Sequence, residues 1–143
     1  MAWDKAQCED IPNLSLALSR PEFEKLVTSA VRGIPSRFRR ILRQENVLLV
    51  VETRPTRRKL LELGMKPAEE TLFGLYEGVP RPERSSYYNF AVPDKITIYQ
   101  EPLETEFGGN YAAIKEAVRR TVLHEIAHFF GWSDAELEAM GWD

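Results

Sequence analysis

Residues 121–134 read TVLHEIAHFFGWSD and contain the pattern H-E-x-x-H-x-x-G-x-x-D. On an α-helix, side chains four residues apart point to nearly the same side, so the imidazoles of His124 and His128 can converge on one divalent metal ion. Glu125 is offset by one residue, which leaves its carboxylate beside the ion and able to polarise a metal-bound water. The stretch therefore predicts a metal site on a helix.

The residues that follow the second histidine predict a third ligand. Gly131 allows the chain to leave the helix through a left-handed backbone conformation, and Asp134 can then return as an oxygen ligand. Three protein ligands with one open position are typical of a catalytic zinc site. Asp134 also has a second explanation, because a carboxylate stabilises the first turn of a helix. If Asp134 is not a ligand, Glu136 and Asp143 are the next candidates.

The same spacing can arise by chance on a buried helix, and two features argue against that explanation. The chain has only two histidines, and both lie in the motif. Apolar residues surround the motif on nearly every side of the helix, so its polar groups would be costly to bury without a metal or hydrogen-bond partners. We therefore expect one zinc ion (Zn2+) per chain on His124, His128 and Asp134, with Glu125 as the general base of a hydrolase.

A resemblance to a known family extends over most of the chain. The sequence is similar to the small bacterial zincin-like metallopeptidases, whose members consist of little more than a minimal zincin domain that ends soon after the metal motif. The similarity runs from about Phe23 to Trp142. It rests on three segments, which are LYEGVP at 75–80, PDKITIYQ at 93–100 and the motif with its preceding residue at 120–134.

The resemblance implies an α+β fold of the minimal zincin type, in which a small mixed β-sheet packs against helices that include the buried metal-bearing helix. It implies the same zinc ligands and general base, and a peptide or protein as the substrate. It also places one predicted strand at the sheet edge above the metal helix, where an extended substrate can add as a further strand. The residues of this candidate substrate-binding strand are Ile96, Thr97, Ile98 and Tyr99.

The remaining pattern predicts several helices and strands. The apolar run at 47–51 predicts a central strand covered on both faces. Residues 78–94 contain three prolines and predict a connector, with a lid in which Tyr87 or Tyr88 donates to an oxyanion as the alternative. Further strands are expected at 72–77 and 95–100, and helices from a Ser19 capping box to Gly33, at 36–43, at 56–64, from an Asn110 cap to Phe130, and from a Ser133 capping box to Met140.

The composition fits one globular domain. The chain has 143 residues, of which 43% are hydrophobic and 29% charged, and no apolar run is long enough to span a bilayer. We interpret residues 1–18 as a loosely packed extension and 19–143 as a single zincin-like domain. The first residues lack the pattern of a secretory signal, and the single cysteine, Cys8, fits a reducing compartment. We expect a cytoplasmic monomer that does not associate with membranes.

Five arginines between residues 32 and 43 form a basic cluster in a chain of net charge −3. We interpret this cluster as a solvated helix face and do not expect nucleic acid to bind, because no aromatic platform accompanies the charges. Two alternatives to a peptidase stay open. One is a metal-dependent RNA-processing hydrolase that uses the cluster, although Glu125 is the residue that a peptidase needs. The other is a non-catalytic binding module in which zinc only stabilises a small fold.

Overall fold

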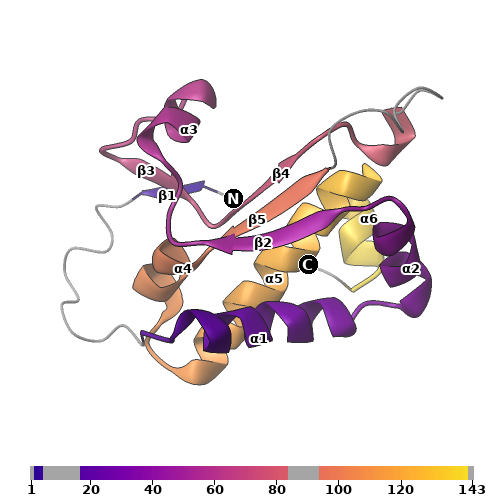
Figure 1. Ribbon diagram of the computed structural model, residues 1–143, viewed down its shortest axis with the longest axis horizontal. Coiled ribbons are helices and arrows are strands. Elements are labelled where there is room, and N and C mark those ends of the chain that lie inside the picture. The colour runs from indigo at the N-terminus through magenta and orange to yellow at the C-terminus, as the bar shows by residue number, and fades with distance from the viewer. Residues whose placement is uncertain (1, 5–16, 84–93, 142–143) are drawn as a thin grey trace.

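The computed structural model describes residues 2–4, 17–83 and 94–141 (Figure 1). Tyr87 and Tyr88 of the predicted connector or lid lie outside the described residues, as do Cys8, Asp143 and most of the N-terminal extension. The elements in chain order are β1 (Ala2–Asp4), α1 (Arg20–Arg32), α2 (Ser36–Gln44), β2 (Leu48–Glu52), α3 (Arg57–Glu62), β3 (Glu70–Leu72), β4 (Gly74–Glu77), the 3-10 helix η2 (Arg81–Glu83), β5 (Lys95–Tyr99), α4 (Gln100–Phe107), α5 (Tyr111–Phe130) and α6 (Asp134–Ala139).

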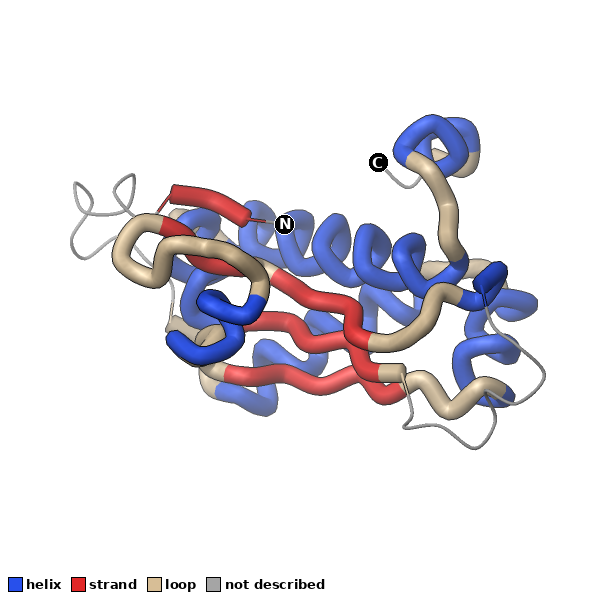
Figure 2. The backbone as a smooth tube through the Cα atoms, turned by 90° about the horizontal axis from the view of Figure 1, so that it is seen from above, coloured by secondary structure: helices blue, strands red, loops and turns tan. Residues whose placement is uncertain are grey.

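The main sheet is small and mixed, as the sequence predicts. Its strands lie in the order β2-β5-β4, with β5 parallel to β2 and antiparallel to β4. The long helix α5 runs along the strands and contacts β4 and β5, while α1 packs against α5 (Figures 1 and 2). A second sheet pairs β1 with β3. The predicted α+β fold, with a small mixed sheet on a buried helix that bears the motif, is confirmed.

Two predicted strand positions are wrong. The strand of residues 47–51 was expected at the centre of the sheet, but β2 is an outer strand, and the central strand is β5, which was expected at the edge. Leu49 and Val51 face the hydrophobic core, whereas Leu48 is 50% exposed, so the helices cover β2 on one face only. A continuous apolar run predicts a strand, but its neighbours in the sheet depend on contacts distant in sequence.

Two further elements differ from the sequence prediction. The strand expected at 72–77 is divided at Phe73 into β3 and β4, which belong to different sheets. The strand expected to end at residue 100 ends at Tyr99, and an unpredicted helix, α4, begins at Gln100. Tertiary contacts fix this junction, because the Gln100 side chain accepts a hydrogen bond from Arg20 Nε at 2.9 Å and donates one to the Leu18 carbonyl at 2.8 Å.

The predicted ends of α5, the helix that bears the motif, are confirmed. The Asn110 side chain accepts a hydrogen bond from the Ala113 backbone N–H at 2.8 Å, which satisfies one of the free donors of the first turn of α5. At the other end, Gly131 has a φ of 72°, the left-handed conformation in which glycine is favoured. Ser19 and Ser133 cap α1 and α6 in the same way as Asn110 caps α5.

Apolar packing holds α5 between α1 and the sheet. The interior includes Phe23 of α1, Ile98 of β5, and Val122 and Phe129 of α5, all with no exposed surface. These contacts bury much of the circumference of α5, so the helix has little freedom to rotate or shift. Among the described residues, none of the helices is long and apolar enough to cross a membrane.

Candidate metal and catalytic centre

The motif side chains meet near the C-terminal end of α5. The ligand-type atoms of His124, Glu125 and His128 all lie within 4.8 Å of one another. The two imidazole rings are one helical turn apart, with centroids separated by 4.5 Å and planes inclined by 68°. Tertiary packing and both helix ends hold this turn in place, so the convergence expected from the four-residue spacing is present.

The three side chains differ sharply in their exposure to solvent. Glu125 is only 1% exposed, whereas the His128 side chain is 47% exposed and His124 is partly buried. The carboxylate therefore lies beneath two imidazoles that solvent can reach. Such an arrangement leaves room for an exchangeable ligand on the outer side of the cluster, as catalytic metal sites require.

A hydrogen bond joins the carboxylate to one imidazole. Oε2 of Glu125 lies 3.1 Å from Nδ1 of His128. An ionised carboxylate can only accept, so Nδ1 of His128 carries the proton, and the neutral ring keeps its Nε2 lone pair for another partner. The contact thus selects the tautomer in which Nε2 can bind a metal.

The electrostatics of the cluster shift the pKa values of its two imidazoles in opposite directions. Burial lowers the pKa of His124, and the nearby His128 lowers it further, although Glu125 acts in the opposite direction. The hydrogen bond with Glu125 raises the pKa of His128. Burial alone would raise the pKa of Glu125, but the hydrogen bond from His128 together with nearby positive charge outweighs burial and holds that pKa below its usual value. Glu125 is therefore ionised at neutral pH and able to accept a proton.

Gly74 of β4 lies directly against the segment of α5 that bears the motif, and no sequence pattern indicates its role. A Cβ atom at this position would lie 2.8 Å from Cγ2 of Thr121 and 3.1 Å from Cγ of Glu125. A glycine here allows the strand to approach the helix and to cover Glu125. Only the pairing of β4 with β5 over α5 reveals this, since a glycine between two short apolar segments is otherwise an ordinary turn signal.

The 3-10 helix η2, which leads into residues 84–93, also contacts the C-terminal end of α5. A Cβ atom at Gly131 would lie 2.8 Å from Cγ of Pro82, so the glycine is required both by its backbone conformation and by the packing of η2 on the turn. The turn after His128 is therefore held by its contact with η2 as well as by its own sequence.

Asp134 is exposed and is the first residue of α6, where Ser133 provides the cap. Its carboxylate is not part of the cluster within 4.8 Å. Its charge nevertheless raises the pKa of both imidazoles, as a smaller influence than burial and Glu125. Ligation by Asp134 stays a prediction, and Glu136, the alternative ligand in the same turn of α6, is exposed as well.

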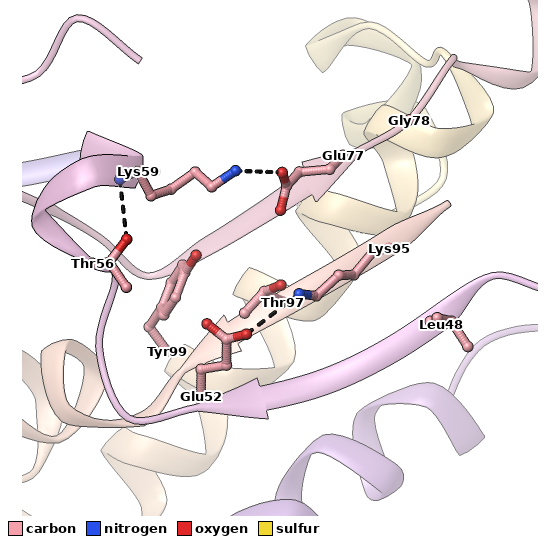
Figure 3. A pocket seen from close by; sticks show the side chains of 9 residues that line it. All are labelled: Leu48, Glu52, Thr56, Lys59, Glu77, Gly78, Lys95, Thr97 and Tyr99. Atoms are coloured by element: carbon pink, nitrogen blue, oxygen red, sulfur yellow. Dashed lines mark hydrogen bonds and ion pairs between the residues drawn. The ribbon is translucent and has the colours of Figure 1, made fainter. Parts of the chain in front are cut away.

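The predicted substrate-binding residues divide between the two faces of the sheet. Ile96 and Ile98 point into the core, whereas Thr97 and Tyr99 line a pocket of about 560 Å³ on the opposite face (Figure 3). All four residues are at most 2% exposed. The central β5 pairs with strands on both sides, so an extended substrate cannot add to it.

Charged side chains surround the mouth of this sheet-face pocket in two opposed pairs (Figure 3). Lys59 contacts Glu77 at 2.7 Å, and Lys95 contacts Glu52 at 3.3 Å. Because each cation already has an anion beside it, the pocket offers no net charge to a ligand. Burial raises the pKa of Tyr99 at its base, so this phenol stays protonated.

Comparison with known proteins agrees with the motif and the fold. A family model described as zincin-like metallopeptidase matches residues 44–142, which include β2, β4, β5 and the whole of α5. None of the curated proteins compared with the chain matches it. The match covers more than half of the chain and contains the complete His-Glu-His cluster on its helix. The chain therefore belongs to the zincin-like metallopeptidase family.

Proposed function

We propose that this protein is a zinc-dependent metallopeptidase in which His124, His128 and Asp134 hold the metal and Glu125 is the general base. One observation carries the proposal: a buried, ionised carboxylate is hydrogen-bonded to one of two converging, solvent-accessible imidazoles. A structural metal site needs no such carboxylate beside the cluster, whereas hydrolysis needs a base there.

The donor set fits zinc. Two imidazoles and a carboxylate oxygen are among the ligands that zinc takes in catalytic sites, and His124 is held neutral, as metal binding requires. When bound, zinc supplies a Lewis acid and lowers the pKa of a water ligand to about 7. Asp134 is our candidate for the third ligand, because it follows the Gly131 turn and its charge already acts on both imidazoles.

Glu125 is placed to move a proton. Its pKa lies below its ordinary value, so the carboxylate is available as a base at neutral pH. The contact with His128 and the packing of Gly74 limit its side-chain motion, which keeps the reactive oxygen in one position. In peptide hydrolysis, Glu125 would take a proton from the attacking water and deliver it to the leaving amine.

The substrate site requires a revision of the sequence-based proposal. We propose that an extended peptide lies along β4 and not along β5. β4 is an outer strand of the sheet, and its Gly74 lies against Glu125, so a chain beside β4 would pass close to the base. Main-chain hydrogen bonds to an outer strand are a common way to bind extended peptides.

A paired screen tests the function. Zinc-loaded wild type and Glu125→Gln are incubated with a diverse peptide library and, separately, with structured RNA. We expect wild type to cleave peptides and Glu125→Gln to lose at least about a hundredfold in rate while retaining zinc. Cleavage of RNA alone would favour the RNA-processing alternative. Zinc retention by a wild type that cleaves neither substrate would favour a non-catalytic binding module.

A further inference from the structure

A second pocket opens on the opposite side of the molecule's core from the histidines. It has a volume of about 330 Å³ and is lined by residues of α1, α2 and β2, near the point where α2 leads into the sheet. This volume is at the lower end of the range of small-molecule sites, roughly 300–1,000 Å³. We call it the arginine pocket, because Arg32, Arg39 and Arg43 all line it.

The interior of the arginine pocket is apolar. Its deepest lining residues are Ile96 of β5 and Ile126 of α5, each 1% exposed, and Leu49 of β2 lies beside them. Val31 and Leu42 contribute further apolar surface from α1 and α2. Water forms few hydrogen bonds with such a lining, so a ligand that places an apolar group there would be favoured.

The three arginines of the pocket have no anionic partner in the part of the chain that the structure describes. Among the described residues, none of them forms an ion pair or a side-chain hydrogen bond, and Nε of Arg39 is buried without an acceptor. An unsatisfied donor that belongs to a charged group is costly when it is buried. Elsewhere on the molecule, arginines contact carboxylates, namely Arg54, Arg58, Arg81 and Arg119.

We propose that the arginine pocket binds a small anionic amphiphile: an apolar chain that enters toward Ile126 and ends in a carboxylate among Arg32, Arg39 and Arg43. The charge complements the unpaired guanidiniums, which bind carboxylates through paired N–H donors, and the chain complements the apolar interior. Nucleic acid fits less well, because none of the described residues that line the pocket is aromatic and could stack on a base.

The arginine pocket is separate from the metal centre. With 3.6 residues per turn, Ile126 points roughly half a turn away from both His124 and His128. A ligand in this pocket would therefore contact α5 on the side opposite the two histidines. It would not compete with a ligand of the His-Glu-His cluster. The proposal does not depend on zinc binding or on peptidase activity.

Calorimetric titration with octanoate tests the proposal, with octanol as the chain without the charge and acetate as the charge without the chain. We expect octanoate to bind at least about tenfold more tightly than either control. Arg39→Gln should weaken octanoate binding at least about tenfold, while Arg40→Gln, which alters an exposed arginine of α2 outside the pocket, should leave it unchanged.

A second pair of variants keeps the test independent of Arg39. Thr28 and Thr105 are exposed helical threonines whose hydroxyls each donate to the carbonyl four residues earlier, but only Thr28 lines the pocket. Thr28→Phe should fill the entrance and abolish octanoate binding, whereas Thr105→Phe should not affect it. His124→Ala should also bind octanoate like wild type.

Several outcomes would overturn the proposal. These are no octanoate binding at millimolar concentration, octanol binding as tight as octanoate binding, or full binding by both Arg39→Gln and Thr28→Phe. Loss of binding in His124→Ala would assign the anion to the metal centre instead. A short peptide ending in leucine presents the same chemistry as octanoate, so competition by its free-acid form but not its amide would identify a chain terminus as the source.

Discussion

Oε2 of Glu125 accepts a hydrogen bond from Nδ1 of His128 at 3.1 Å, between residues three positions apart on α5. One contact thereby has two chemical effects. It keeps Glu125 ionised in a buried position, and it leaves Nε2 of His128 as the nitrogen with a free lone pair. The base and the metal ligand of the proposed mechanism are therefore set by the same pair.

We expect purified protein to bind one zinc ion per chain. His124→Ala and His128→Ala should each abolish this binding, because either change leaves too few nitrogen donors. Lys115→Ala, at an exposed position of the same helix, serves as the control. Elemental analysis and calorimetry under non-chelating conditions check the prediction, and equally low zinc in wild type and both histidine variants would contradict it.

In the metal-free protein, we expect His128 to contribute to stability in a pH-dependent way. Its pKa is raised above 6.5 by the hydrogen bond with Glu125. A raised folded-state pKa gives a stabilisation that is fully present below the unfolded-state value and is lost as the pH rises through the folded-state value. Wild type should thus have a larger free energy of unfolding than His128→Asn at about pH 5.5, and this difference should decrease as the pH rises to about 8.5. Urea unfolding in the presence of a chelator measures this difference at each pH. A difference that increases with pH would contradict the prediction.

Gly74→Ala should destabilise the protein by about 1–3 kcal/mol, because the added methyl group overlaps Thr121 and Glu125 of α5. It should also reduce peptidase activity by displacing the base. Gly109→Ala is the matched control, since a Cβ atom there meets nothing within 4 Å, and its effect should stay within about 0.5 kcal/mol. Thermal and urea unfolding distinguish the two, and equal stability of both variants would show that β4 and α5 are farther apart.

Asp134→Asn separates the two roles of this residue. Ser133 provides the cap of α6, so the change should cost the metal-free protein at most about 1 kcal/mol. If Asp134 is a ligand, the same change should weaken zinc affinity at least about tenfold. Competition with a zinc chelator measures the affinity. Unchanged affinity would show that the third ligand lies elsewhere, with Glu136 as the described candidate to test next.

The helix that bears the motif could be predicted in detail because its determinants are local. The Asn110 cap, the left-handed Gly131 and the four-residue spacing of the histidines each act within one or two helical turns. Helical periodicity and capping are properties of short segments, so a single sequence contains them. The α+β class and the family followed from the same motif together with the strand patterns around it.

The order of the strands was decided by the tertiary structure alone. Strand propensity indicates that residues 47–51 and 95–100 are extended, but it does not indicate which of them lies in the centre. That depends on pairings between segments distant in the chain, such as Leu49 with Ile96 and Gly74 with Ile98. The close approach of Gly74 to Glu125 and the apolar interior beneath Arg39 likewise exist only once these segments are packed together.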